Sequence, residues 1–310
     1  MRALGQSMRG ASVALVVGAT AALGAAPGAA AATRGHHHAG ATTRTLRIAA
    51  QDSATSPFAD SHPRFALALR HGQTVAAGLV ELQLSNRSRM MQHQAQLARL
   101  HPGVSVSHFL ATARQDGDNA AMALVDVAGG ADTIAPGERQ TTWQWLAPGR
   151  YVVICLVDDP DGKSHLDLGM VSSFRVTGTP SGRRRPRGHV AGTITARTQG
   201  SKMSFTLPRH FTGNGLYRFV NAKGDDLHEL SIVRLATGRT RQDVIDWFTH
   251  PGPPPFTGAG GFGAVAPHQG GWLRLHLKPG RYVATCFIPD DKPPHMPHGA
   301  MGMDLAFTIH

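Results

Sequence analysis

The sequence repeats itself, and this repeat restricts the chain to a fold that can be built twice. The segment GGADTIAPGERQTTWQWLAPGRYVVIC (129–155) aligns without a gap on GGFGAVAPHQGGWLRLHLKPGRYVATC (260–286), 131 positions later. Further matches join HLDLGMVSSFRV (165–176) to HGAMGMDLAFTI (298–309), and LQLSNRSRMMQHQAQLARL (82–100) to YRFVNAKGDDLHELSIVRL (217–235). Small length differences between well-matched blocks are typical of loop variation in a duplicated domain. We therefore expect two domains of one fold.

The pattern within each copy predicts an all-β fold. Segments such as GLVELQLSN and GLYRFVN alternate apolar and polar residues over strand length, between turn residues. About seven short strands of this kind make one β-sandwich per copy. One short helix is expected in each, and in the second copy Thr240 and Asp243 have the spacing of a capping box. The segment PGPPPFTGAGGFG (251–263) that follows predicts an irregular loop, because it consists largely of proline and glycine.

Composition divides the rest of the chain. Residues 1–32 have a basic start, an apolar stretch and a small-residue end, the layout of a secretory signal peptide. Residues 33–42, with GHHHAG, are expected to form a disordered tail. The two domains are then assigned to 43–178 and 191–310, joined by a basic linker at 179–190 that contains GRRRPRG. No later segment has 18 consecutive apolar residues, so we expect a secreted or cell-wall-associated protein without a membrane span.

The two cysteines occupy equivalent positions in the two copies, and this position argues against a disulfide. Cysteines outside the cell normally pair, but equivalent positions in separate domains seldom meet. Metal ligation is the alternative for Cys155 and Cys286, because a histidine and then a methionine follow each of them. With one upstream histidine, each copy offers a thiolate, two imidazoles and a thioether, the ligand set of a blue-copper site. The two sets are His93, Cys155, His165 and Met170, and His228, Cys286, His298 and Met303.

This order of ligands resembles the cupredoxin family, typified by plastocyanin, over most of both repeats. The endings HLDLGM and HGAMGM look most like HxxxGM in the first domain of copper nitrite reductases. The resemblance implies two tandem Greek-key cupredoxin-like β-sandwiches that each bind one copper ion. It gives His93 and His228 the role of the upstream ligand, and it makes the cysteines, the loop histidines and the two methionines the remaining ligands.

The sequence also departs from the family. Nine residues separate the cysteine from the histidine in the first copy and eleven in the second, more than in small blue-copper proteins. Gln94 and Glu229 stand where cupredoxins often carry an asparagine that ties the ligand loops together. In the second copy His295, Met296 and Met301 compete with His298 and Met303, although His298 and Met303 preserve the match between copies. The alternative hypothesis is therefore a cupredoxin-like binding or structural module that has lost tight copper binding.

The residues beside the cysteines bear on function. Copper oxidases and reductases place a histidine next to the thiolate, whereas Ile154 and Leu156 flank Cys155, and Thr285 and Phe287 flank Cys286. We find no paired HxH motif for a second copper centre either. The sequence thus favours electron transfer or extracytoplasmic copper carriage over a copper oxidoreductase, with an unknown redox or copper-exchange partner.

The remaining expectations concern charge and packing. The net charge of +11 allows weak association with an anionic cell wall, but no nucleic-acid-binding motif accompanies it. Two tyrosines and two tryptophans are expected to pack in the core or against turns rather than relay electrons. Two asparagines that lie seven residues before the upstream histidines are expected to form turns. These residues are Tyr151, Tyr282, Trp143, Trp272, Asn86 and Asn221.

Overall fold

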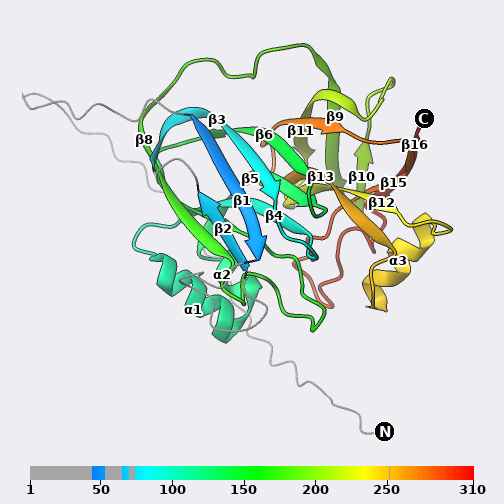
Figure 1. The fold of residues 1–310 in the computed structure, drawn as a ribbon, viewed down its shortest axis with the longest axis horizontal. Helices are drawn as coiled ribbons and strands as arrows, with labels where there is room; N and C mark the ends of the chain where they lie inside the picture. Colours follow the sequence, from blue (N-terminus) through cyan, green and yellow to red (C-terminus); the bar gives the residue numbers. More distant parts are fainter. Residues whose placement is uncertain (1–43, 53–64, 70–73, 251) are drawn as a thin grey trace, which may run out of the picture. The chain divides into compact units, whose positions relative to one another are not determined.

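Strands make up most of the computed structural model, which describes residues 44–52, 65–69, 74–250 and 252–310 (Figure 1). The predicted signal peptide and the histidine-containing tail lie outside the described residues. The first repeat contains β1 (Thr45–Asp52), β2 (Phe65–Leu69), β3 (Thr74–Asn86), β4 (His93–Leu100), α1 (Val106–Asp116), α2 (Asp118–Met122), β5 (Val125–Ile134), β6 (Arg139–Leu146), β7 (Gly149–Ile154) and β8 (Val171–Ser181). The second contains β9 (Val190–Gln199), β10 (Lys202–Thr206), β11 (Asn214–Lys223), β12 (His228–Leu235), α3 (Arg241–Thr249), β13 (Phe256–Val265), β14 (Gly270–His276), β15 (Gly280–Thr285) and β16 (Asp304–Ile309).

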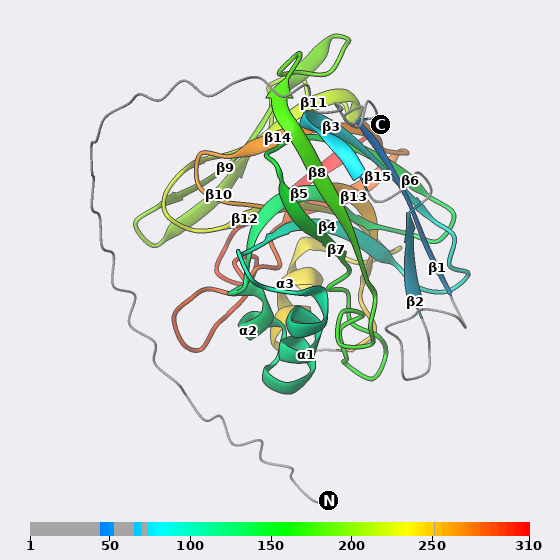
Figure 2. The same cartoon turned by 90° about the vertical axis from the view of Figure 1, so that its left-hand side faces the viewer.

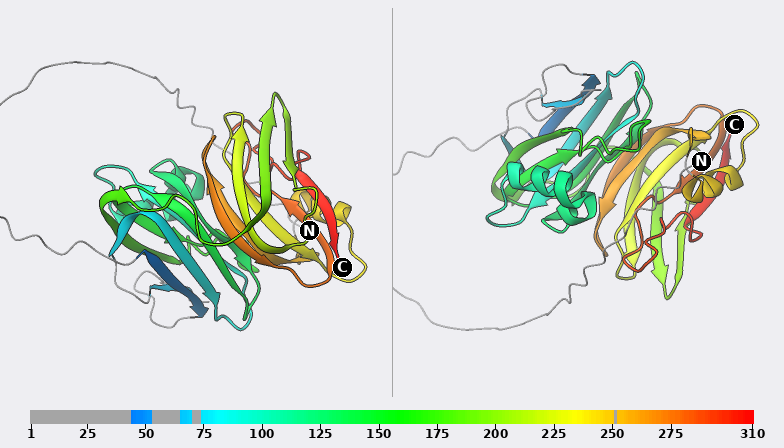
Figure 3. Two further views of the ribbon diagram at one scale, coloured as in Figure 1. Left: turned by 90° about the horizontal axis from the view of Figure 1, so that it is seen from above. Right: turned by 90° about the horizontal axis from the view of Figure 1, so that it is seen from below.

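Each repeat is a β-sandwich of two four-stranded layers, as the alternation predicted (Figure 3). In the first repeat the layers have the strand orders β2-β1-β3-β6 and β8-β7-β4-β5, and in the second β10-β9-β11-β14 and β16-β15-β12-β13. Connections that cross between the layers give the Greek-key arrangement. The all-β prediction with short helices is confirmed, and the first repeat adds a second helix, α2 (Figure 2). The domain boundaries stay a prediction; β8 ends at Ser181 and β9 begins at Val190.

The PGRY segments fold as the sequence indicated, with each tyrosine inside its sandwich. Tyr151 is buried, stacks on Phe174 and donates a hydrogen bond from Oη to the carbonyl of Ala147 (2.9 Å). Tyr282 repeats this arrangement with the carbonyl of Lys278 (2.6 Å). Each tyrosine therefore packs in the core and closes the turn before its strand.

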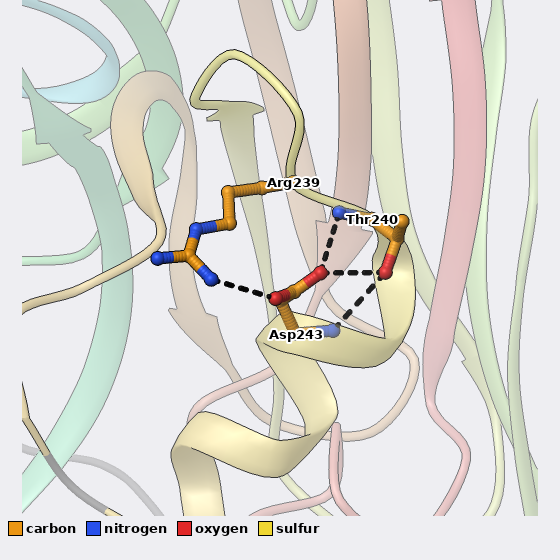
Figure 4. A network of polar contacts seen from close by, with 3 residues as sticks. All are labelled: Arg239, Thr240 and Asp243. Carbon is orange, nitrogen blue, oxygen red and sulfur yellow. Dashed lines mark hydrogen bonds and ion pairs between the residues drawn. The ribbon is translucent and has the colours of Figure 1, made fainter.

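Helix α3 begins at the predicted capping box (Figure 4). The side chain of Asp243 accepts a hydrogen bond from the backbone N–H of Thr240 (2.8 Å), and the Thr240 hydroxyl accepts one from the Asp243 N–H (3.4 Å). Arg239 adds an ion pair to the same carboxylate (3.0 Å). Two N–H groups that a helix start would otherwise leave unpaired are thus satisfied.

The loop predicted at 251–263 is wrong over most of its length, because β13 begins at Phe256. This strand lies between β12 of its own repeat and β5 of the other repeat. Its glycines permit this close packing: a Cβ at Gly258 would stand 2.6 Å from the Thr133 carbonyl oxygen, and one at Gly263 2.4 Å from Oε1 of Gln96. The glycines that suggested a loop are therefore sites of close approach between strands.

Equivalent strands join the two repeats. β5 pairs antiparallel with β13, and β6 pairs antiparallel with β14. In the first pair Ala131 faces Phe262, the residue 131 positions later, so the pairing is nearly two-fold symmetric, like an isologous dimer interface. Gln96 and Gln140 strengthen it, since Oε1 of each accepts a hydrogen bond from the backbone of β13, from Ala264 (2.7 Å) and Gly261 (2.9 Å).

A buried carboxyl group lies in this junction and gives it a pH dependence. Asp132 on β5 accepts a hydrogen bond from the Ser231 hydroxyl on β12 (2.6 Å). Burial raises its pKa from 3.8 to about 6, against the lowering effect of its hydrogen bonds to Ser231 and Thr133. A raised acid pKa means that folding favours the protonated group. Its contribution to stability is therefore complete below pH 3.8 and is lost as the pH rises through 6.

Asp132→Asn is expected to remove this loss, because the amide oxygen still accepts from Ser231 and cannot ionise. The melting temperature of the variant minus that of the wild type should increase by about 5 °C between pH 4 and pH 7. Thermal melts of metal-free protein across this range measure the difference, and Asp116→Asn, which removes an exposed carboxylate at the end of α1, is the control. A difference that does not change with pH would contradict the assignment.

None of the described helices is long and apolar enough to cross a membrane.

Candidate metal centres

The first site is assembled by the pairing of β4 with β7. His93 is the first residue of β4. Ile154, the last residue of β7, pairs with Gln96 on β4, and Cys155 directly follows it. The segment after Cys155 turns back on itself through a bridge between Asp158 and Ser164. This turn brings His165 back to the cysteine. The backbone N–H of His165 donates a hydrogen bond to the carbonyl of Val157 (2.9 Å). The nine-residue interval is thus a closed hairpin that does not displace the histidine.

Three donor atoms converge in this site. Nδ1 of His93 lies 3.1 Å from Nδ1 of His165, and the Sγ of Cys155 lies 3.7 Å and 3.3 Å from these two nitrogens. All three side chains have no exposed surface. A metal ion at about 2.0–2.3 Å from each of three ligands requires donors about 3.5–4 Å apart, so a small outward movement of the donor atoms is all that separates this cluster from a trigonal site.

The second site is assembled in the same way, by the pairing of β12 with β15. His228 begins β12, and Cys286 directly follows β15. A bridge between Pro289 and Pro297 closes the longer loop, and the N–H of His298 donates to the carbonyl of Ile288 (2.9 Å), as in the first repeat. Sγ of Cys286 lies 3.6 Å from Nδ1 of His298, and the donor atoms of His228, Cys286 and His298 all lie within 4.8 Å of one another.

The structure separates the rival histidines and methionines of the second loop. His295 is exposed and its Nδ1 faces the carbonyl oxygen of Asp290 (3.0 Å), so it takes no part in the cluster. Met301 is 42% exposed, whereas Met303 is fully buried in the same apolar cluster as Cys286. Met170 is likewise buried with Cys155. The backbone N–H of each buried methionine donates to the carbonyl of the loop histidine, at 2.7 Å and 2.9 Å. Their role as fourth ligands stays a prediction.

Burial makes both clusters neutral. It lowers the pKa of His93 to about 3, with a further effect of His165, and it lowers the pKa of His165 to about 4. Burial also raises the pKa of the Cys155 thiol to about 12 and that of Cys286 well above its usual range. A thiolate here therefore needs a cation beside it, which a bound metal provides.

Several buried ring nitrogens have no partner among the described residues. In the second site Nε2 of His228 is held by the hydroxyl of Thr198 (2.7 Å), and its Nδ1 is buried and unpaired. A buried nitrogen without a hydrogen bond is costly unless it binds something else. Since the unpaired Nδ1 belongs to the same group as Cys286, the donors fit a soft metal ion that prefers nitrogen and sulfur, as copper does.

Sequence reasoning missed part of the support around these sites. Asn86 and Asn221, predicted as turn formers, are buried, and the amide of each donates to two carbonyls. One of these carbonyls belongs to Ile134 (3.0 Å) or Val265 (3.2 Å), the residue paired with the upstream histidine. The asparagines thus anchor the loop that leads into each histidine strand. Their equal spacing before the histidine was the available signal.

The residues after the upstream histidines tie the ligand segments together in different ways. The backbone N–H of Gln94 donates to the Sγ of Cys155 (3.4 Å). Glu229 is buried, and its carboxyl accepts a hydrogen bond from the N–H of Phe287 (2.9 Å), the residue after Cys286. The second site therefore has a side-chain link between its histidine strand and its cysteine loop, although asparagine is absent. Phe65 on β2, which no sequence signal indicated, covers the first site, with its ring centroid 4.2 Å from that of His165.

Each repeat brings together two histidines and one cysteine, the donor types of a type 1 copper site. No protein-family model and no curated protein matches the chain. Solved structures similar to it include reduced auracyanin from the photosynthetic bacterium Roseiflexus castenholzii, which is 21% identical over 45% of this chain and 100% of its own, with a TM-score of 0.29. Rusticyanin from Thiobacillus ferrooxidans is 15% identical over 44% of this chain and 79% of its own (TM-score 0.27). A multicopper oxidase is 16% identical over 86% and 89% (TM-score 0.23). At these TM-scores the likeness carries no inference about function, for which the donor atoms are the evidence.

Proposed function

We propose that this protein binds one copper ion in each repeat and acts outside the cytoplasm in electron transfer or copper carriage. The observation that carries the proposal is the convergence of two imidazoles and one thiol in a buried cluster, formed twice by equivalent residues. His93, Cys155 and His165 would hold the first ion. Their counterparts in the second repeat would hold the other, and the buried methionine of each repeat would be a weak axial ligand. Copper bound in this way supplies a one-electron Cu(I)/Cu(II) couple.

The contribution of the protein is to keep the donors in place. In each site the upstream histidine is fixed by a strand, and the cysteine directly follows the neighbouring strand. The loop histidine is held by the backbone hydrogen bond that closes its hairpin. Burial excludes water from the donors. Ligands that are already fixed by packing and hydrogen bonds need little rearrangement when the metal changes its oxidation state, which suits electron transfer.

A carrier is favoured over an oxidoreductase by the surroundings of the two clusters. The residues that flank Cys155 and Cys286 are apolar or hydroxyl-bearing, so neither thiolate has a histidine neighbour that could lead to a second copper centre. Among the described residues, the two His–Cys–His groups are the only ones in which at least three histidine, cysteine or carboxylate ligands converge. These features support a mononuclear site in each repeat.

A metal-free binding module is the second candidate, and one observation favours it. In the first site the two Nδ1 atoms lie only 3.1 Å apart, close enough for a hydrogen bond between neutral rings. With protonated thiols, the clusters can thus persist as neutral packing groups.

Titration of the metal-free protein with Cu(II) distinguishes the two candidates. We expect two equivalents to bind, with an intense blue absorption from thiolate-to-copper charge transfer that saturates at the second equivalent. Elemental analysis after desalting measures the stoichiometry. A colourless protein that retains no copper would refute the copper proposal and leave the binding module.

Met170→Leu tests the axial ligand. The substitution conserves volume in the core but removes the thioether. We expect copper to remain bound, with the reduction potential of the first site raised by about 60 mV or more, because loss of an axial donor destabilises Cu(II) more than Cu(I), which takes fewer ligands. Voltammetry and the visible spectrum measure the change. The exposed Met301, substituted in the same way, is the matched control and should leave both sites as they are. An unchanged potential in Met170→Leu would show that the methionine is not a ligand.

We also propose secretion, on the basis of the signal-peptide pattern in residues 1–32. Mass spectrometry of the protein recovered from culture supernatant tests this, and a chain that keeps its first 30 or so residues in the cytoplasm contradicts it.

A further inference from the structure

The outward face of the sheet that crosses the junction between the repeats carries an unusual set of side chains. Trp143 alternates along β6 with Thr142 and Gln144, which are buried, and Trp272 on β14 precedes the core residue Leu273. The indoles are therefore on the side of the sheet away from the core. We call this surface the Trp–Arg face; it consists of Trp143, Trp145, Trp272, Arg184, Arg218 and Arg274. Its strands β3, β6, β11 and β14 are labelled in Figure 2.

Strand pairing brings these residues into a ladder. Trp143 lies directly opposite Trp272, and Trp272 lies directly opposite Arg218 on β11. The guanidinium of Arg274 stands 5.8 Å from the ring centroid of Trp143. On the next rung Arg184, from the segment that joins the repeats, lies 4.6 Å over the ring of Trp145. The face thus uses residues of both repeats and of the segment between them.

Stacking on an indole orients a guanidinium without using its N–H groups. All three arginines are exposed, and none of their guanidinium groups has a hydrogen bond or ion pair with another described side chain. The carboxylate nearest in the ladder, Glu81, already accepts hydrogen bonds from Nε1 of Trp143 (3.2 Å) and from the Gln83 amide. The arginine forks are therefore free to bind an anion, with less loss of side-chain entropy than flexible lysines would require.

We propose that the Trp–Arg face binds a linear anionic polysaccharide. Arginine forks match carboxylate or sulfate groups in a bidentate manner, and the net charge of +11 attracts a polyanion. The outward position beside the ladder, Thr141, offers a hydroxyl group that suits a hydroxyl-rich chain. A single-stranded nucleic acid fits less well. It needs open aromatic faces for base stacking, and guanidinium groups already lie over two of the three indoles.

Binding of polygalacturonate by the metal-free full-length protein tests this proposal and is independent of copper. Because three of the four tryptophans are on the face, the change in tryptophan fluorescence reports binding directly. The triple variant Arg184→Ala, Arg218→Ala, Arg274→Ala is expected to lose at least about tenfold in affinity. The control triple Arg150→Ala, Arg175→Ala, Arg281→Ala removes the same charge from exposed positions on β7, β8 and β15, and should lose less than about threefold. Thermal melts verify that both variants are folded.

A charge-neutral variant adds a second arm. Trp145→Ala removes the platform of Arg184 while the net charge stays constant, and it should weaken polygalacturonate binding by about threefold or more. Equal losses in the two triple variants would show that only bulk charge matters and would overturn the proposal. Tighter binding of a single-stranded DNA oligonucleotide of matched charge, weakened by the same face variants, would overturn it in favour of nucleic acid. Absence of binding at low salt would refute it outright.

Discussion

Cys155→Ser should abolish copper binding in the first repeat while the second repeat keeps its ion, so that copper stoichiometry and blue absorption both fall to about half. The reason is chemical. A thiolate is the only donor of the set that gives an intense charge-transfer band, and a serine hydroxyl does not ionise in a buried site. Cys286→Ser should produce the complementary loss, and the double variant should be colourless. Elemental analysis and visible absorption of the three variants measure this.

Two further variants show whether the loss reflects ligation. His298→Ala should remove the second ion, as Cys286→Ser does, because its Nδ1 lies 3.6 Å from the cysteine sulfur. His295→Ala, in the same loop but exposed and turned to the carbonyl of Asp290, should retain both ions. Melting curves of the metal-free variants separate loss of a ligand from loss of the fold. Equal copper content in the two histidine variants would contradict the assignment of the loop ligand.

The sequence indicated the candidate ligands because the repeat served as an internal comparison. A cysteine, histidine and methionine kept at matching positions in two copies stand out from the acidic residues that vary between them. The same comparison favoured His298 over His295 without deciding between them, and the structure places His298 in the cluster. The β-sandwich could be predicted for a similar reason, because alternation of apolar and polar residues is a local property of each strand.

Features that depend on distant parts of the chain could not be predicted from the local sequence. β13 could not be recognised, because its glycines are required by the backbone of β12 and by the pairing with β5 of the other repeat, neither of which the local sequence shows. Phe65 over the first site has no matched signal in the second copy. The tie from Glu229 to Phe287 is made by a buried carboxyl group, for which the sequence gives no pattern. Long-range packing decided each case.

Substitution in the GG pair that the two copies share is expected to have a large effect on stability. Gly130 on β5 has φ +127°, and a Cβ there would stand 2.1 Å from the carbonyl oxygen of Ala95 on β4. Gly261 is its counterpart, with a Cβ position 1.7 Å from the carbonyl oxygen of Leu230. In both repeats the strand register shifts beside this glycine, between the upstream histidine and the residue two positions later. The glycine therefore permits the bulge that sets the histidine strand.

Gly130→Ala should destabilise the protein by about 3 kcal/mol or more, because backbone strain adds to a clash with a carbonyl that cannot move away without breaking strand pairs. Gly238→Ala is the matched control, since φ is +79° there but no heavy atom lies within 4 Å of the added carbon, and it should cost only about 1 kcal/mol. Urea unfolding of the metal-free variants measures both. Because Ala95 lies two residues after His93, Gly130→Ala should also weaken copper binding in the first repeat more than in the second. If the two variants unfolded at the same urea concentration, the close approach of β5 to β4 would not be what demands glycine.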